Sequence, residues 1–401
     1  MSLLALIVAA FAAFGLVQSL SGLLAVRRFR GGAPPAPLAR PPVSVLKPLH
    51  GDEPMLEAAL ASFCAQHYPN FQIVFGVQDA ADPAVGVVRR LQTRFPEHDL
   101  VLVVDSTPHG ANRKISNLIN MFPRARHDLL VIADSDVHVA PDYLERIVAA
   151  LDVPGTGLVT TVYSGLPARA DLSSNLGATQ ISHVFLPGAL LARGLGRQDC
   201  LGATMALKRE TLMAIGGLHA LADHLADDAM LGKLIGAQNL AVRLAATVPA
   251  TTVPEAALPA LFHHELRWGR TIQSLEPLGY ALSLVQYPIF WAVLAMALSG
   301  VEQWSVGLFA AAWACRAGVS RGIDRMLGLA VAAPVWLLPL RDLMSVSVIL
   351  ASHRGKQVKW RGQVLRVDRP AYAAGSYAPP YAAPAYAPAS YARPDRLLRK
   401  G

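Results

Sequence analysis

Two carboxylates, one residue apart, follow a run of five apolar residues in the middle of the chain. Residues 129–133 read Leu-Leu-Val-Ile-Ala, and Asp134-Ser-Asp136 comes directly after them. Such a run predicts a strand buried on both faces, and the carboxyl ends of such strands form the ligand-binding edge of an open α/β sheet. Carboxylates at that edge suit Mg²⁺ or Mn²⁺ bound to a diphosphate. The alternative is a turn or a helix cap before Pro141.

The elements around this motif alternate between strand and helix, which predicts an α/β fold with a largely parallel sheet covered on both faces. Expected strands are 43–46, 71–77, 100–104, 129–133, 158–163 and 200–207. Expected helices are 54–66, 83–95, 112–121 and 141–151. A second acidic position, Asp79, follows the strand 71–77, so acids from two strands should meet at one sheet edge. Asp82 reads as a helix cap before Pro83.

Composition indicates a membrane protein. The chain has 401 residues, of which 53% are hydrophobic, and its mean hydropathy is +0.35, which is high for a soluble protein. The net charge of +8 is interpreted as Lys and Arg flanking membrane spans and not as a nucleic-acid surface. Three widely spaced cysteines form neither a metal pair nor a disulfide framework, as expected in a reducing compartment.

The N-terminal apolar segment, residues 3–26, is long enough to span a bilayer and is followed by Arg27, Arg28 and Arg30. The positive-inside rule then puts the following domain in the cytoplasm. We expect this span to be an anchor that an unrelated span could replace. Further candidate spans are 281–299, 304–315 and 327–352. The last contains the adjacent charges Arg341 and Asp342, which should face protein or water.

The predicted domain organisation follows from these segments. Its parts are an N-terminal transmembrane helix (1–30), a linker (31–42), a catalytic domain (43–256), an amphipathic interface helix (257–280), C-terminal membrane helices (281–352), a basic segment (353–370) and a low-complexity tail (371–401).

A further acid at Asp228 and an Arg267-Trp268 pair complete a series that begins with Asp79 and the Asp-x-Asp motif. In this order the residues resemble the motifs of membrane-bound inverting glycosyltransferases of families 2 and 21. Segments closer to ceramide glucosyltransferases and bacterial hopanoid glycosyltransferases are Lys47-Pro-Leu-x-Gly, Val77-Gln-Asp-x-x-Asp-Pro and Gly110-x-Asn-x-Lys. The resemblance covers about residues 43–362. It implies a GT-A, Rossmann-like cytoplasmic domain with transmembrane helices at both ends.

The resemblance also implies roles at the donor site. Its donor-binding residues are Asp79, Gly110, Asn112, Lys114, Asp134 and His264. Asp79 would accept a hydrogen bond from the uracil base, unless it is a turn residue. Lys114 would bring positive charge to the nucleotide, unless it is a surface lysine. Asp136, assisted by Asp134, would hold Mg²⁺ or Mn²⁺ against the diphosphate.

At the acceptor side, the resemblance makes Asp228 the general base. The alternatives are Asp227 as the base, or both acids as first-turn helix residues. Arg267 would grip the diphosphate and Trp268 would line the acceptor site, unless both anchor an interfacial helix. His264 stands where the family motif has Gln or Arg, which is a departure. His183 is expected to serve packing.

The implied function is sugar transfer from a UDP-sugar to a membrane lipid at a bacterial inner membrane, by a multi-pass protein. We prefer transfer of N-acetylglucosamine to a hopanoid such as bacteriohopanetetrol. The alternatives are glucosylation of ceramide and, in another class, a catalytically inactive membrane scaffold. The expected partners are the donor, the lipid and the bilayer, with no nucleic acid.

Overall fold

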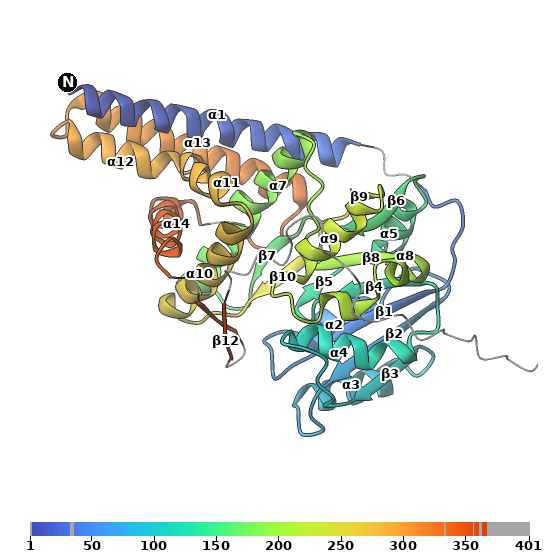
Figure 1. The fold of residues 1–401 in the computed structure, drawn as a ribbon. Coiled ribbons are helices and arrows are strands. Elements are labelled where there is room, and N and C mark those ends of the chain that lie inside the picture. Colours follow the sequence, from blue (N-terminus) through green and yellow to red (C-terminus); the bar gives the residue numbers. More distant parts are fainter. Residues whose placement is uncertain (1, 33–35, 333, 356, 361–362, 367–401) are drawn as a thin grey trace, which may run out of the picture. The chain divides into compact units, whose positions relative to one another are not determined.

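A computed structural model describes residues 2–32, 36–332, 334–355, 357–360 and 363–366 of the chain (Figure 1). Residues 33–35 of the predicted linker, part of the basic segment and the whole predicted tail 371–401 lie outside the described residues.

A seven-stranded sheet is the framework of the domain that follows the first helix. The strands run in the order β3-β2-β1-β4-β8-β6-β9. Their bounds are β1 Val43–Pro48, β2 Phe71–Val77, β3 Asp99–Val104, β4 Leu129–Ala133, β6 Thr156–Thr160, β8 Thr204–Lys208 and β9 Ala241–Leu244. Most neighbours pair in parallel, which confirms the predicted α/β sheet. The exception is β8, which is antiparallel to both β4 and β6.

Both faces of this sheet are covered, and β4 illustrates why its sequence is a continuous apolar run. Val131 packs in one core with α2 (Leu56–Cys64), α3 (Ala84–Arg94) and α5 (Tyr143–Leu151). Ile132 packs in the other, with α4 (Arg113–Met121), α8 (Arg209–Ala214) and α9 (Asp227–Ala237). Because successive side chains point to opposite faces, a strand between two helix layers needs apolar residues at every position.

A smaller sheet lies beside the end of β4. It has the order β5-β10-β7, with bounds β5 Val137–His138, β7 Ser164–Pro167 and β10 Ala250–Val253. β5 begins directly after Asp136, and β10 pairs antiparallel with it. The Asp-x-Asp motif is therefore held between the large sheet and the small one.

The remaining helices belong to the apolar part of the chain. They are α1 Leu3–Gly31, α6 Leu172–Gln180, the π-helix η2 Ile181–Phe185, α7 Leu186–Gly194, α10 Leu258–Leu275, α11 Pro277–Leu282, η4 Ser283–Gln286, α12 Pro288–Leu298, α13 Gln303–Leu327, η5 Val335–Leu337 and α14 Leu338–Ser352. A hairpin of β11 Gln357–Trp360 and β12 Gln363–Arg366 follows.

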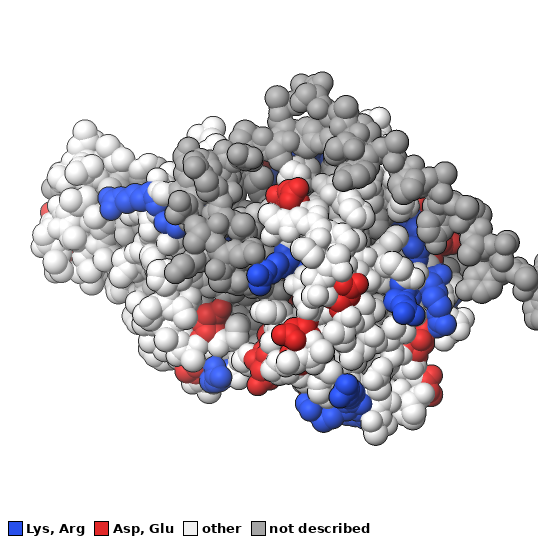
Figure 2. Space-filling view, turned by 60° about the horizontal axis from the view of Figure 1, so that its bottom comes forward, with Lys and Arg blue, Asp and Glu red and all other residues white. Residues whose placement is uncertain are grey.

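Two stretches of the described residues are long and apolar enough to cross a membrane, α1 and Val335–Ser352. The predicted span 281–299 falls on Pro277–Gln286 and Pro288–Leu298, a pair bent by 68° that adds a third span if it crosses as one. The predicted span 304–315 lies within α13, which is longer than expected and carries charged residues. In Figure 2 the helical end of the molecule, at the left, is largely free of charge.

α1 packs tightly against the other helices and is more than an anchor. α12 and α13 lie alongside it (Figure 1). A Cβ added at Gly15 would come within 2.5 Å of the Val285 carbonyl oxygen, and one at Gly22 within 2.9 Å of Pro187 Cβ. Our expectation that an unrelated span could replace α1 therefore conflicts with this close helix packing.

Buried ion pairs join these helices. The Arg341 guanidinium donates to both carboxylate oxygens of Glu265, at 2.7 Å each. Arg316 donates to Asp342 at 3.0 Å, and both side chains are almost fully buried. The adjacent charges at 341 and 342 thus face protein, as expected from the cost of exposing them to lipid.

Candidate active site

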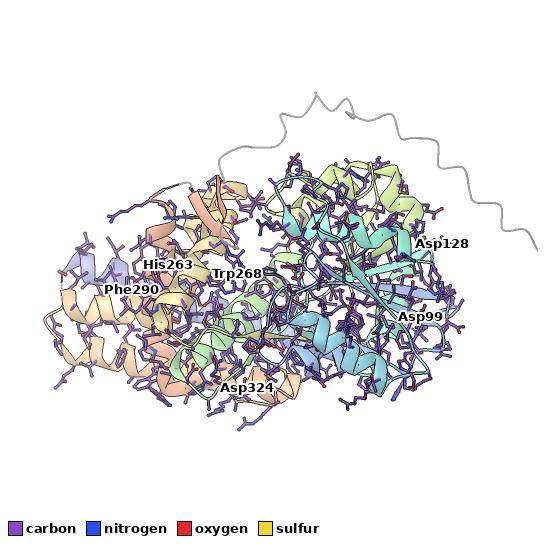
Figure 3. The ribbon with its side chains drawn as sticks, turned by 90° about the horizontal axis from the view of Figure 1, so that it is seen from below. Asp99, Asp128, His263, Trp268, Phe290 and Asp324 are labelled. Carbon is purple, nitrogen blue, oxygen red and sulfur yellow. The ribbon has the colours of Figure 1, made fainter. Side chains whose placement is uncertain are left out.

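The carboxyl ends of the parallel strands face the apolar helices. Asp99 begins β3 and Asp128 precedes β4, and Figure 3 shows both residues at the end of the molecule away from those helices. The strands therefore run toward the helices, and Trp268 lies between the helices and the sheet (Figure 3). The acids at the strand ends accordingly lie at the edge of the sheet that faces the apolar helices.

The Asp-x-Asp motif sits at this edge, and both of its aspartates are partly exposed. The side chain of Asp134 is 37% exposed. Its Oδ1 forms an ion pair with Lys114 Nζ at a distance of 2.6 Å. Asp136 accepts a hydrogen bond from the Thr251 hydroxyl at 2.5 Å. Burial and the neighbouring charge of Asp134 raise the pKa of Asp136. Two carboxylates that repel each other form a site in which a cation is favourable.

Lys47, known from the sequence only as part of a family motif, lies beneath this pair. Its side chain is fully buried, donates to the Asp134 carbonyl oxygen and lies over the Phe63 ring at 4.0 Å. Burial lowers the pKa of Lys47 to about 7, although Asp136 and Asp134 favour the charged form.

The predicted donor loop around Gly110 and Asn112 is built into the protein. The Asn112 side chain is buried, caps α4 by accepting from Ile115 N at 3.1 Å, and donates to the His224 carbonyl at 2.8 Å. Gly110 has a φ of +155°, and a Cβ there would lie 2.6 Å from the Ala222 carbonyl oxygen. These two residues therefore fix the loop before α4, and the first turn of α4 carries Lys114.

Lys114 is the point where two acidic elements meet. Its Nζ lies 2.6 Å from Asp134 Oδ1 and 3.6 Å from Asp227 Oδ2. Burial lowers the pKa of Lys114, but the carboxylates of Asp134 and Asp227 outweigh it and the net effect is a rise. The reading of Lys114 as a solvated surface lysine is wrong, because its side chain is only 13% exposed.

The two acids at the start of α9 have different surroundings. Asp227 is buried against Lys114 and lies 3.4 Å from the Asn112 amide nitrogen. Asp228 Oδ1 accepts from the Ala229 backbone N–H at 2.8 Å. Burial and the charge of Asp227 raise the pKa of Asp228 to about 6. A Cβ at Gly202 would lie 2.9 Å from Asp228 Oδ2, so glycine leaves room beside this carboxylate.

Tyr163, which the sequence gave no reason to select, lies between these acids and the apolar helices. Burial and the charges of Asp228, Asp134 and Asp136 raise the pKa of its hydroxyl. Its ring lies 4.6 Å from that of Phe185, and Tyr163, Phe185 and Trp268 pack against one apolar cluster. The cluster therefore brings the Arg267-Trp268 helix up to the acidic site.

His264 on α10, which departs from the family motif, has a partner nearby. His264 Nδ1 contacts the Glu255 carboxylate, and the His264 ring lies 4.4 Å from the Trp268 ring. Burial acts to raise the pKa of Glu255, but the hydrogen bond and charge of His264 and the charge of Arg267 lower it. His264 thus orders this helix through Glu255 and Trp268.

Asp79 stands apart from the other acids. It is exposed after β2, and its Oδ1 accepts from Ala81 N at 2.9 Å in a turn. Because β1 separates β2 from β4, Asp79 lies on the same edge at a distance of two strand spacings, on the order of 10 Å. Asp82 accepts from Gly51 N and Ala84 N, as a structural cap does.

The metal-binding capacity of the site rests on two carboxylates. Among the described residues, no group of three or more His, Cys, Asp or Glu side chains is arranged to hold a metal ion. Mg²⁺ is commonly bound by one or two carboxylates together with substrate phosphates and water. Asp134 and Asp136 fit this mode, because both are partly exposed and their mutual repulsion favours a cation.

The family model of glycosyl transferase family 21 matches residues 7–372 of the chain. The chain belongs to glycosyl transferase family 21. It is 25% identical over 234 residues to ceramide glucosyltransferase 1 of Caenorhabditis elegans, covering 57% of this chain and 49% of that protein. It is 32% identical over 114 residues to the ceramide glucosyltransferase of Komagataella phaffii, covering 27% and 22%. The chain thus spans half or less of these relatives.

The fold of this family 21 member is also that of a solved glycosyltransferase. A mannosyltransferase from Pyrobaculum calidifontis, in complex with GDP-mannose and Mn²⁺, aligns with a TM-score of 0.51 at 19% identity. The alignment covers 88% of this chain and 99% of that one. The predicted GT-A fold is therefore confirmed.

Proposed function

We propose that this family 21 protein transfers glucose from UDP-glucose to the hydroxyl group of ceramide or a closely similar membrane lipid, with inversion at the sugar. The convergence of Asp134, Asp136 and Asp228 at the edge facing the apolar helices carries the proposal. The names of the relatives favour ceramide and glucose over the hopanoid and N-acetylglucosamine that the sequence suggested to us.

In the proposed reaction Asp228 takes the proton from the lipid hydroxyl. The oxygen then attacks the anomeric carbon as the bond from that carbon to the UDP oxygen breaks, so one displacement inverts the centre. A raised pKa of about 6 suits this role, because the carboxylate is ionised at neutral pH and more basic than an ordinary aspartate. Asp227 is the weaker candidate for the general base, since its carboxylate already contacts Lys114 and Asn112.

The other side chains would bind and orient the two substrates. Asp134 and Asp136 would hold Mg²⁺ or Mn²⁺, which stabilises the charge developing on the departing diphosphate when it is bound. Asp79, at the outer part of the same edge, would accept from the uracil base. Arg267 would contact the diphosphate with its planar set of donors. Trp268 would pack on the lipid next to Tyr163.

This arrangement also supports a location. The active edge faces α1 and the other apolar helices, and Arg27, Arg28 and Arg30 lie at the end of α1 next to the sheet domain. The positive-inside rule then favours a cytoplasmic active site at a cell membrane.

The test is transfer in detergent micelles that contain ceramide, with UDP-glucose and Mn²⁺, followed by mass spectrometry of the lipid. Glucosylceramide should form with the wild-type protein and fall at least about a thousandfold with Asp228→Asn. Ser299→Ala, at the end of α12, is the control and should keep wild-type activity. Repeating the assay with UDP-N-acetylglucosamine and bacteriohopanetetrol tests the other donor and acceptor. Transfer to that lipid alone would overturn the proposal.

A further inference from the structure

A cation that belongs to the protein itself contacts one of the predicted metal ligands. Lys114 Nζ lies 2.6 Å from Asp134 Oδ1, an oxygen that would bind Mg²⁺ or Mn²⁺. At this distance the contact is a short hydrogen bond between two charged groups. A metal ion that coordinates Asp134 has to displace the lysine or share the carboxylate with it. Lys114 and the metal ion therefore compete for the same acid.

Asp227 offers the Lys114 ammonium a second position. Asp227 Oδ2 lies 3.6 Å from Lys114 Nζ, which is longer than a hydrogen bond. Within the described part of the chain this oxygen has no hydrogen-bond partner, although Asp227 is only 8% exposed. A buried carboxylate oxygen without a donor is unfavourable. A movement of the ammonium by about 1 Å toward Asp227 would form the missing bond.

The surroundings hold Asp227 in place and allow the lysine side chain to move. The Asn112 amide nitrogen lies 3.4 Å from Asp227 Oδ1 and donates to the His224 carbonyl at 2.8 Å. Asn112 also caps α4, so it fixes the backbone that carries Lys114. Because a lysine has a flexible four-carbon stem, its ammonium can pass from Asp134 to Asp227 while the helix stays where it is.

The other lysine near the Asp-x-Asp motif cannot move in this way. Lys47 is fully buried, and its Nζ lies over the Phe63 ring at 4.0 Å. It donates to the main-chain carbonyl of Asp134 and not to the carboxylate. Lys47 therefore supports the backbone of the motif. Of these two lysines, Lys114 is the one whose position can depend on what the acids bind.

We propose that Lys114 takes the place of the metal ion at Asp134 in the free protein and moves to Asp227 Oδ2 when the metal ion binds. The inference rests on the proposed function, because it takes Asp134 and Asp136 as the metal ligands. It adds an order of binding. The metal ion alone gains two carboxylates but disrupts the contact between Lys114 and Asp134. The diphosphate of the donor supplies further oxygen ligands, so the metal ion binds tightly with the nucleotide and leaves with UDP.

The test measures Mn²⁺ binding to the full-length protein in detergent, with and without UDP. Calorimetry gives the affinity, and electron paramagnetic resonance counts the Mn²⁺ that stays free. Without UDP, Lys114→Met should tighten Mn²⁺ binding about tenfold, which corresponds to one hydrogen bond between charged groups. Lys114→Arg restores a cation beside Asp134 and should return the affinity to about the wild-type value.

Asp227→Asn distinguishes movement of Lys114 from an effect of charge alone. In the protein that keeps Lys114, this substitution removes the second acceptor and should weaken Mn²⁺ binding about tenfold. In the Lys114→Met protein it should change the affinity by less than about twofold, because no ammonium needs the acceptor. A pure charge effect would be additive, so it would weaken binding by the same factor in both proteins.

The matched control is Arg113→Met, since Arg113 is the exposed neighbour of Lys114 on α4. It should keep the wild-type affinity for Mn²⁺ with and without UDP. Lys114→Gln also removes the charge and should behave as Lys114→Met, which preserves the test if the Met variant does not fold. Unchanged Mn²⁺ affinity in both uncharged variants, or equal weakening by Asp227→Asn in both proteins, would overturn the inference. A wild-type protein that binds no Mn²⁺ even with UDP would instead contradict the metal site of the proposed function, and this inference with it.

Discussion

Replacing Asp228 with Asn should make the protein more stable while abolishing transfer. Burial and the Asp227 charge raise the pKa of Asp228 from 3.8 to about 6, so the folded protein holds this carboxylate in an unfavourable charged form at pH 7. A difference of about two pKa units corresponds to at most about 3 kcal/mol of unfolding free energy. Asn removes the charge and can still accept from Ala229 N.

The gain in stability from Asp228→Asn depends on pH. Below pH 4, Asp228 is protonated in both the folded and the unfolded state, so it does not lower the free energy of unfolding of the wild-type protein. This destabilisation grows between pH 4 and 6 and is complete above pH 6. The difference in melting temperature between Asp228→Asn and wild type should therefore be near zero at pH 4. It should reach the order of 5 °C at pH 7. The loss of transfer persists at every pH.

The assay is thermal unfolding in detergent, followed by tryptophan fluorescence, with EDTA and without donor so that no ligand alters the charge. Asp227→Asn is the matched control, and it should lower the melting temperature because it removes a partner of Lys114. An Asp228→Asn protein that melts at or below the wild-type temperature at pH 7 would refute the reasoning, whatever its activity.

Three further outcomes follow from the geometry. Asp136→Ala should abolish metal-dependent binding of UDP-glucose, measured by calorimetry with and without Mn²⁺, and normal binding would contradict the metal assignment. Gly22→Leu should lower the melting temperature by overpacking α1 against α7, at a cost of about 1–3 kcal/mol; an unchanged value would restore α1 to the role of a simple anchor. Glu265→Gln should destabilise the protein by about 3–5 kcal/mol, because Arg341 loses a buried partner. Thermal unfolding of the double variant Glu265→Leu/Arg341→Met should recover most of that loss, and equal losses in single and double variants would argue against the pair.

The strands of the sheet and the acids that follow them could be predicted from the sequence, because both depend on the local pattern of apolar and acidic residues. An apolar run that ends in carboxylates marks a strand and its carboxyl end, as residues 129–136 illustrate. Strand direction is not encoded in such runs, since a buried strand is apolar at every position in either orientation. The antiparallel insertion of β8 between β4 and β6 was therefore not predicted.

The rest of the site depends on contacts between distant residues. Tyr163 has no motif and is identified only by its position near three acids that come from two other segments, the end of β4 and the start of α9. Asn112 and Gly110 match a family motif, but their contacts with residues 222–224 give them a structural role that a motif cannot reveal. The pairing of Arg341 with Glu265 joins residues 76 positions apart. The sequence predicted only that Arg341 and Asp342 should face protein or water.

The buried ion pair between Arg341 and Glu265 has a consequence for how the protein is made. The helix bearing His264, Arg267 and Trp268 is synthesised well before its counter-ion, which arrives with the last apolar helix. A ribosome that has delivered only the first 340 residues has made every acid of the reaction centre, yet the carboxylate of Glu265 still lacks its cation. Because Arg341 belongs to α14, Glu265 gains its buried partner only once α14 has been synthesised and packed against α10. We therefore expect the nascent chain to lack transfer activity until that point.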